Sequence, residues 1–343
     1  MLQAICTEAL LRKDYINEKV STIYFGGGTP SLLKIADLRL QIEKLRELFA
    51  LEDNAEITLE ANPDDITAEK LAEWKMAGIN RLSIGIQSFF EEDLQWMNRA
   101  HSAEQALQSI LLAQEAGFDN ITIDLIYGTP TLTDERWVHN IQTAISLKIP
   151  HLSCYALTVE PKTVLYKMIE QHKMPNIDSE KQSRHFEILM QLAGAAGFEH
   201  YEISNFAKPG RRSRHNSSYW QGKQYLGLGP SAHSYNGNSR QWNISNNALY
   251  LKSIEQNTIP FEIEYLTATQ QLNEYIMTSL RTMEGLSLYH VRQTWGAKNK
   301  EQIEKDARKF LDAGTLELKN DHLVLTPKGK FFADGIAAAL FTA

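Results

Sequence analysis

Short apolar runs rich in β-branched residues alternate with segments of helical periodicity through the first half of the chain. Five such runs stand at residues 22–25, 56–60, 81–86, 121–126 and 151–157. A strand followed by a helix and a second strand requires a right-handed crossover, which makes neighbouring strands parallel. The runs are largely apolar, as is typical of strands covered on both faces. We therefore predict an α/β fold with a parallel sheet of at least five strands, either open or curled into a barrel.

Helix signals fill the gaps between these runs. Ser102 and Gln105 form a capping-box pattern at the start of one helix, and Gly117 fits the position just past its end. Another helix is expected to stop near Gly78. The alternation breaks near residue 158, and KPGRRSR at 208–214 followed by HNSSYW predicts a long functional loop rather than a regular element.

The last quarter of the chain has a different order of elements. The signals are a capping box at Thr267 and Gln270, a helix near 300–311, strands at 316–318 and 323–325 joined at Asn320 and Asp321, and a helix with Thr326 as cap and Pro327 at its first position. Helix, hairpin and helix in this order indicate an α+β, winged-helix-like domain.

The charge balance argues against nucleic acid as the default partner. Lys and Arg number 35 against 42 Asp and Glu, a formal net charge of −7 at pH 7, so no global positive field attracts DNA or an anionic membrane. Residues 289–330 carry nine basic against six acidic side chains, which favours a packing or client-docking role over phosphate binding. No apolar run approaches about 18 residues and no signal-peptide pattern opens the chain. We expect a cytoplasmic protein.

Polar residues close successive runs, at the edge where parallel sheets and barrels bind ligands. Glu60, Gln87 and Asp124 stand at or near the ends of three runs, and glycines 26–28 follow the first. The glycines either let the main chain approach a ligand or form a tight turn. Taken singly, Glu60 and Gln87 are also explained as strand-end residues bonded to backbone. A carboxylate within an apolar run, Asp124, needs a partner such as Arg99 or a ligand.

Several longer segments occur together and in order. They are YFGGGTPSLL at 24–33, LEANP at 59–63, SIGIQSF at 83–89, NRAH at 98–101 and IDLIYGTP at 123–130. As a set they resemble the radical S-adenosylmethionine (SAM) proteins of the oxygen-independent coproporphyrinogen III oxidase group. HNSSYW at 215–220 and YLGLGPSAHSY at 225–235 look like the heme chaperone branch of that group, HemW, rather than the oxidase.

This resemblance implies a domain plan and a function. The plan is a partial (β/α) TIM-like barrel over 1–205, a connecting region with the HNxxYW motif over 206–265, and a winged-helix-like domain over 266–343. The implied function is a heme chaperone that binds heme and SAM and delivers heme to client proteins, with possible transient contact with membrane-bound clients and no nucleic acid. The alternative is the oxidase, whose SAM-derived radical chemistry decarboxylates coproporphyrinogen III.

The resemblance also implies ligand contacts residue by residue. The SAM pocket would comprise Gly27, Gly28, Thr29, Glu60, Gln87, Arg99, Asp124 and Ala156, and heme would contact His215, Tyr219 and Trp220. A neutral imidazole is a common axial ligand of heme iron, which suits His215. A separate hypothesis pairs Arg211, Arg212 and Arg214 with the heme propionates, although a solvated basic loop explains these arginines equally well.

One feature of the family pattern is missing from this sequence. The family places a C-x3-C-x2-C segment ahead of the glycine-rich strand, and its thiolates hold a [4Fe–4S] cluster that chelates SAM. This chain has only Cys6, on an expected helix over residues 2–15, and Cys154, inside the fifth run. Neither suits a cluster ligand.

The missing segment leaves two explanations open, a truncated sequence or a lineage that has lost the cluster. We expect truncation, because the rest of the SAM pocket is intact in pattern, and with it the absence of the first barrel strand and the cluster loop. Cleavage of SAM is then not expected from this polypeptide. Its SAM affinity should fall, while heme binding through His215 should survive.

Overall fold

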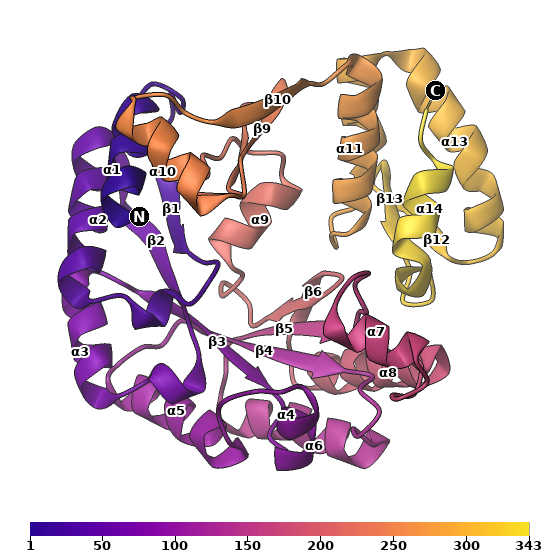
Figure 1. Ribbon diagram of the computed structural model, residues 1–343. Coiled ribbons are helices and arrows are strands. Elements are labelled where there is room, and N and C mark those ends of the chain that lie inside the picture. The colour runs from indigo at the N-terminus through magenta and orange to yellow at the C-terminus, as the bar shows by residue number, and fades with distance from the viewer. Residues whose placement is uncertain (343) are drawn as a thin grey trace. The chain divides into compact units, whose positions relative to one another are not determined.

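The computed structural model describes residues 1–342, which form two compact units (Figure 1). The barrel unit comprises Tyr24–Ile35 and Glu56–Ser213. The terminal unit comprises residues 1–23, 36–55 and 214–342. The terminal unit therefore combines segments from both ends of the chain.

A seven-stranded sheet in the order β1-β2-β3-β4-β5-β7-β6 curls into part of a barrel (Figure 1). Its strands are β1 (Val20–Phe25), β2 (Leu51–Ala61), β3 (Arg81–Gln87), β4 (Ile121–Tyr127), β5 (His151–Ala156), β6 (Glu199–Glu202) and β7 (Asn205–Ala207). The pairs β2–β3, β3–β4 and β4–β5 are parallel, whereas β7 pairs antiparallel with β5 and β6. The five predicted strands and the partial barrel are confirmed. The β6–β7 hairpin is not predicted, because strands of four and three residues carry too little periodicity.

The helices of the barrel unit follow the predicted strand-helix order. They are α3 (Ala68–Ala77), α4 (Glu91–Trp96), α5 (Ala103–Glu115), α6 (Asp134–Ser146), α7 (Val164–Glu170) and α8 (Ser179–Ala195), with 3-10 turns at Pro30–Leu32 and Pro63–Asp65. The capping box of Ser102 and Gln105 is formed at the start of α5. Gly78 and Gly117 follow α3 and α5 with φ of 97° and 80°, a left-handed conformation that glycine adopts without strain.

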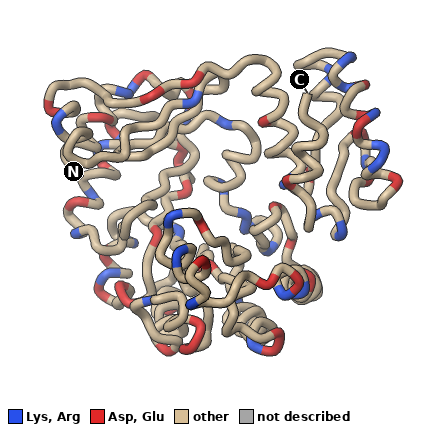
Figure 2. The backbone as a smooth tube through the Cα atoms, turned by 45° about the vertical axis from the view of Figure 1, so that its right-hand side comes forward, with Lys and Arg blue, Asp and Glu red and all other residues tan. Residues whose placement is uncertain are grey.

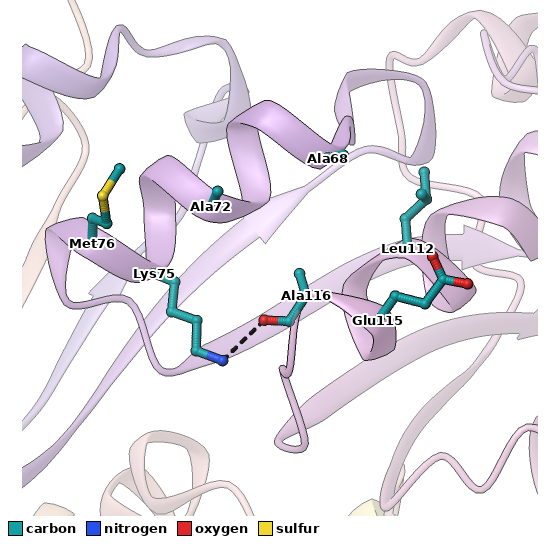
Figure 3. A pocket seen from close by; sticks show the side chains of 7 residues that line it. All are labelled: Ala68, Ala72, Lys75, Met76, Leu112, Glu115 and Ala116. Atoms are coloured by element: carbon teal, nitrogen blue, oxygen red, sulfur yellow. Dashed lines mark hydrogen bonds between the residues drawn. The ribbon is translucent and has the colours of Figure 1, made fainter.

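A shallow cavity of about 450 Å³ lies between the surface helices α3 and α5 (Figure 3). Lys75 of α3 donates from Nζ to the carbonyl oxygens of Ala116 and Gly117, both at 2.9 Å. The last carbonyls of a helix lack partners within the helix, so this lysine satisfies them and favours the helix dipole. The rest of the lining is mostly small or apolar. The cavity is therefore a packing gap between two helices that Lys75 ties together at one end.

The terminal unit contains an antiparallel sheet in the order β10-β9-β8, and its helix α1 packs against α10. The elements are α1 (Leu2–Leu11), α2 (Ile35–Leu48), α9 (Arg214–Trp220), β8 (His233–Tyr235), β9 (Ser239–Asn243), α10 (Asn247–Glu255) and β10 (Phe261–Tyr265). Helix α9 corrects a prediction, because HNSSYW is helical and not part of a loop. Helices this short have little propensity of their own, and α9 is stabilised by its contact with α11 (Ala268–Leu280).

The last elements of the terminal unit have the predicted helix, hairpin and helix order. After α11 come β11 (Leu286–Ser287), α12 (Leu288–Trp295), α13 (Ala297–Asp312), β12 (Leu316–Lys319), β13 (His322–Leu325), a 3-10 turn at Gly329–Phe332 and α14 (Ala333–Ala339). Asn320 and Asp321 turn the hairpin with φ of 48° and 62°, as a type I′ turn requires. The predicted cap at Thr326 is shifted: its Oγ1 accepts from the Gly329 N–H at 3.1 Å and opens the 3-10 turn, not an α-helix.

Charge is dispersed over the molecule. Figure 2 shows acidic and basic residues interspersed along the chain. On α13, Lys300 pairs with Glu304 at 2.6 Å, as is typical of a solvated helix face rather than of a phosphate-binding one. Among residues 1–342, no helix combines the length and apolar character needed to cross a membrane.

Candidate functional site

The barrel unit contains a polar cavity of about 210 Å³ at the carboxyl ends of β2 and β3. Its lining is Gly28, Thr29, Pro30, Ser31, Glu60, Ala61, Asn62, Ser83, Gly85, Gln87, Arg99 and Asp124. Six of the eight residues predicted for SAM line this cavity. Gly27 and Ala156 are not part of the lining, although Gly27 contacts one of its carboxylates. The structure thus places strand-end side chains from distant parts of the sequence in one cavity, as predicted.

Glu60 is held in place by the glycine-rich segment and by a tyrosine. The Tyr24 hydroxyl donates to Oε1 at 2.7 Å, and the Gly27 N–H donates to Oε2 at 3.1 Å. Burial and the Glu60 charge raise the pKa of Tyr24, so this hydroxyl keeps its proton. A Cβ on Gly26 would lie 2.7 Å from the Tyr24 ring and 3.0 Å from Glu60. The glycine at 26 therefore serves close packing, whereas Gly27 and Gly28 serve the turn, with φ of 74° and 63°.

Gln87 occupies an unusual backbone conformation at the rim of the cavity. Its φ is 65° and the register between β3 and β4 shifts between Ile84 and Gln87. Left-handed conformations of residues other than glycine cost energy and tend to occur at functional sites. A Cβ on Gly85 would lie only 2.9 Å from Gln87 Nε2. The bulge and the glycine thus let the Gln87 amide fold over the strand toward the cavity.

Asp124 and Glu60 place two carboxylates in one cavity. Burial first, and the Glu60 charge second, raise the pKa of Asp124 to about 7. The predicted pairing of Asp124 with Arg99 is not found as a direct contact: Arg99 Nη2 donates to Asn62 Oδ1 at 3.0 Å, and its charge acts on Asp124 through space. Arg81 also acts to lower the pKa of Asp124, yet burial and Glu60 outweigh both arginines. The result is a crowded pair of acids, which suits a cationic ligand.

The predicted heme residues lie on α9 in the terminal unit. His215 Nδ1 lies 3.0 Å from Thr22 Oγ1, and its Nε2 lies 3.1 Å from the Tyr219 hydroxyl. When Nδ1 carries the imidazole proton, its N–H donates to Thr22 Oγ1 and the Tyr219 hydroxyl donates to Nε2. This tautomer puts the lone pair on Nε2, the nitrogen nearer the exposed Tyr219. The contact with Thr22 fixes the ring in the way that ligands of metals are usually held.

Trp220 and the neighbouring arginines differ from expectation in their contacts. The Arg281 guanidinium lies 5.2 Å from the Trp220 ring centroid, a cation–π contact. The three arginines proposed for propionates are each paired with a carboxylate of the protein: Arg211 with Asp119, Arg212 with Glu199 and Arg214 with Glu52. Each guanidinium therefore has a carboxylate partner within the protein, and no contact of the described residues points to a heme propionate at this arginine-rich segment.

Sequence reasoning missed some residues of the cavity. Asn62, Ser83 and Gly85 line it, and Tyr24 supports it from behind Glu60. The signal was available, because all four stand inside the family segments at 24–33, 59–63 and 83–89. Their roles depend on three-dimensional contacts that no spacing rule encodes.

Comparison with known proteins decides the family. The sequence profile of the Radical SAM superfamily matches residues 8–144, and that of the HemN C-terminal domain matches residues 266–332. The heme chaperone HemW of Bacillus subtilis is 35% identical over 322 residues, which cover 93% of this chain and 85% of that protein. The chain belongs to the HemW family.

Two further relatives and one solved structure are also similar to this chain. HemW of Escherichia coli is 39% identical over 215 residues, 63% of this chain and 56% of that protein. The bovine mitochondrial radical S-adenosyl methionine domain-containing protein 1 is 38% identical over 226 residues, 66% and 51% of the two chains. Coproporphyrinogen III oxidase (HemN) from Escherichia coli superposes with a TM-score of 0.84 at 23% identity, covering 99% of this chain and 82% of that one. That likeness shows a shared fold.

The HemW-family fold implies SAM and a [4Fe–4S] cluster, and the described residues fit only the first. The paired carboxylates, the amides and the glycine-rich turn suit the sulfonium, hydroxyl and amino groups of SAM. The two thiols do not suit a cluster, which uses several thiolates from one loop. Cys6 and Cys154 are both buried and burial raises the pKa of each, and residues 1–342 hold no group of three His, Cys, Asp or Glu arranged for a metal ion.

Proposed function

We propose that this HemW-family chain is a heme chaperone, which holds heme through α9 and passes it to a client protein. The observation that carries the proposal is the placement of His215, whose Nδ1 lies 3.0 Å from Thr22 Oγ1 while its Nε2 lies 3.1 Å from the hydroxyl of the exposed Tyr219. The Tyr219 side chain must turn about χ1, which moves its hydroxyl oxygen away from Nε2, before Nε2 can bind iron. A contact that one side-chain rotation breaks suits a ligand that is bound and later released.

The expected result of His215→Ala is a heme affinity at least about tenfold lower, because the axial ligand is lost. The measurement is titration of the purified chain with hemin, followed by the Soret band. Thr22→Val is expected to weaken binding by a smaller factor, since it removes only the anchor of the ring. His233→Ala, an exposed histidine on β8 of the same unit, is the matched control. Equal affinity of His215→Ala and the unmodified chain would remove His215 from the site.

We propose in addition that SAM occupies the cavity of the barrel unit. When bound, SAM supplies a sulfonium cation next to the protein carboxylates. Glu60, positioned by Tyr24 and Gly27, accepts hydrogen bonds from the ligand hydroxyls, and Asp124 offsets the positive charge. Gln87 and Arg99 supply donors to the remaining polar groups.

Glu60→Ala should lower the affinity for SAM about tenfold, because a charge-assisted acceptor is lost. Calorimetric titration of the chain with SAM measures this affinity. Tyr24→Phe should also lower the affinity for SAM, but by a smaller factor, since Glu60 keeps its hydrogen bond from the Gly27 N–H. Glu69→Ala on the exposed side of α3 should bind as the unmodified chain does. An unchanged affinity for Glu60→Ala would place SAM elsewhere.

A further inference from the structure

Four aromatic rings of the terminal unit follow one another from His215. The ring centroids of His215 and Tyr219 are 5.1 Å apart, those of Tyr219 and Tyr225 are 4.7 Å apart, and those of Tyr225 and Tyr235 are 6.0 Å apart. The first two contacts are edge-on, within the range of favourable aromatic pairs. Tyr225 and Tyr235 also exchange two backbone hydrogen bonds of 2.9 Å. The backbone bonds therefore fix Tyr225 and Tyr235 beside each other, in a ring series that begins at the proposed axial ligand.

Arg240 of β9 stands at the other end of this series. Its guanidinium carbon lies 5.8 Å from the Tyr235 ring centroid, and its Nη2 lies 2.9 Å from Glu274 Oε2. Its Nε is buried and has no hydrogen-bond partner among the described residues. A guanidinium has five N–H donors, and a planar carboxylate can use two of them at once. Arg240 thus keeps donor capacity beside an aromatic surface.

Glu274 of α11 is the residue that now pairs with Arg240. Burial raises the pKa of Glu274, while Arg240 lowers it. The carboxylate is therefore a partly desolvated partner, whose ionised form is less favoured than that of a fully exposed glutamate. A ligand carboxylate able to reach the same guanidinium would compete with it.

We propose that Arg240 binds a propionate carboxylate of heme, with Tyr225 and Tyr235 flanking the macrocycle. The inference rests on the proposed function, because it places the aromatic part of the same ligand beside the ring series that starts at His215. The ligand class follows from the chemistry: a flat aromatic body suits the tyrosines, and an attached carboxylate suits the arginine. Unlike Arg211, Arg212 and Arg214, Arg240 combines an aromatic contact on this ring series with an unpartnered buried donor.

The test compares hemin with hemin dimethyl ester, in which both propionates are uncharged, by Soret titration of the full chain. Arg240→Gln is expected to bind hemin about tenfold more weakly and the ester as well as the unmodified chain does, because only the charge-assisted bond is lost. Glu274→Gln removes the competing charge and is expected to tighten hemin binding several-fold without changing the ester. Arg292→Gln, an exposed arginine on α12, is the matched control.

The outcomes separate this inference from the function on which it rests. His215→Ala should weaken both ligands, because iron ligation does not depend on the propionates. Equal weakening of both ligands by Arg240→Gln would reveal a merely structural role and overturn the inference, as would unchanged hemin binding. If Arg281→Gln, and not Arg240→Gln, weakens hemin binding without affecting the ester, the propionate binds the arginine over Trp220. That result would also overturn the inference. Unchanged hemin binding by His215→Ala would count against the proposed function alone.

Discussion

Replacing Glu8 by alanine is expected to lower the free energy of unfolding by about 3–5 kcal/mol, the range found when one partner of a buried ion pair is removed. Glu8 on α1 is completely buried. Its Oε1 accepts from Asn243 Nδ2 at 2.7 Å, and its Oε2 accepts from the Tyr250 hydroxyl at 2.6 Å and from the Gly229 N–H at 2.8 Å. The substitution removes the carboxylate acceptor of all three donors, of which only Asn243 Nδ2 keeps another acceptor, the Gly229 carbonyl at 2.8 Å.

The loss of Glu8 also strands a buried cation. Arg12 lies one turn further along α1, with Nε 3.8 Å from Glu8 Oε1, and it is 5% exposed. It donates to Ser234 Oγ at 2.9 Å and to Gln241 Oε1 at 2.6 Å. Neutral acceptors hold the guanidinium in place but do not balance its charge, and burial lowers the pKa of Arg12. The alanine variant therefore carries an uncompensated positive charge between α1 and the β8–β10 sheet.

Urea denaturation followed by circular dichroism and tryptophan fluorescence measures this effect. The free energy of unfolding of Glu8→Gln should lie between those of Glu8→Ala and the unmodified chain, because the amide keeps the shape and part of the hydrogen bonding but not the charge. Glu47→Ala removes a surface glutamate paired with Lys44, with the Glu47 side chain 66% exposed, and should change stability by less than about 0.5 kcal/mol. A loss below about 1 kcal/mol for Glu8→Ala would show that water or a rearranged side chain replaces the carboxylate.

Glu8 also shows what the sequence does not reveal about this fold. It stands in a helix with ordinary spacing, and its partner Asn243 is 235 positions away. No periodicity distinguishes such a residue from a solvated helix glutamate. The parallel strands, in contrast, were predictable because each is an apolar run that is covered on both faces, and the sheet order follows from right-handed crossovers.

Elements that depend on neighbours in the sequence were predicted, whereas elements that depend on contacts with distant residues were not. Capping boxes at Ser102 and Thr267 depend on neighbours three residues away and are confirmed. Helix α9 depends on its contact with α11, and the sequence alone suggested a loop. The antiparallel sheet of β8, β9 and β10 was likewise missed, since every residue of β10 is exposed and the strand has no buried face to mark it.

The polar cavity was predictable in outline because ligand sites of α/β sheets gather at the carboxyl ends of strands. Glu60, Gln87 and Asp124 were identified on that rule and share one cavity. Their detailed arrangement was not predictable. The Arg99 side chain turns to Asn62 rather than to Asp124, which leaves Asp124 governed by burial and by the neighbouring Glu60.

Asp124→Asn is expected to stabilise the chain at pH 8 by about 2 kcal/mol, which is a discounted conversion of the pKa shift. The pKa of Asp124 is raised to about 7, chiefly by burial and then by the Glu60 charge. An unfolded aspartate titrates near pH 3.9. Between these values the unfolded chain has released its proton while the folded chain retains it, so folding is penalised increasingly as the pH rises. The amide has no such penalty and keeps nearly the same shape.

The sign of the pH dependence gives the sharper test, because it does not depend on the absolute stability. The difference in unfolding free energy between Asp124→Asn and the unmodified chain should grow from about pH 4 to pH 7 and level off above pH 8. Other groups that titrate in this window cancel in the difference. Asp119→Asn, at an exposed aspartate paired with Arg211, should give a small, flat difference over the same range. A difference for Asp124→Asn that is constant with pH would mean that Asp124 is ionised throughout and that the barrel cavity carries two full negative charges.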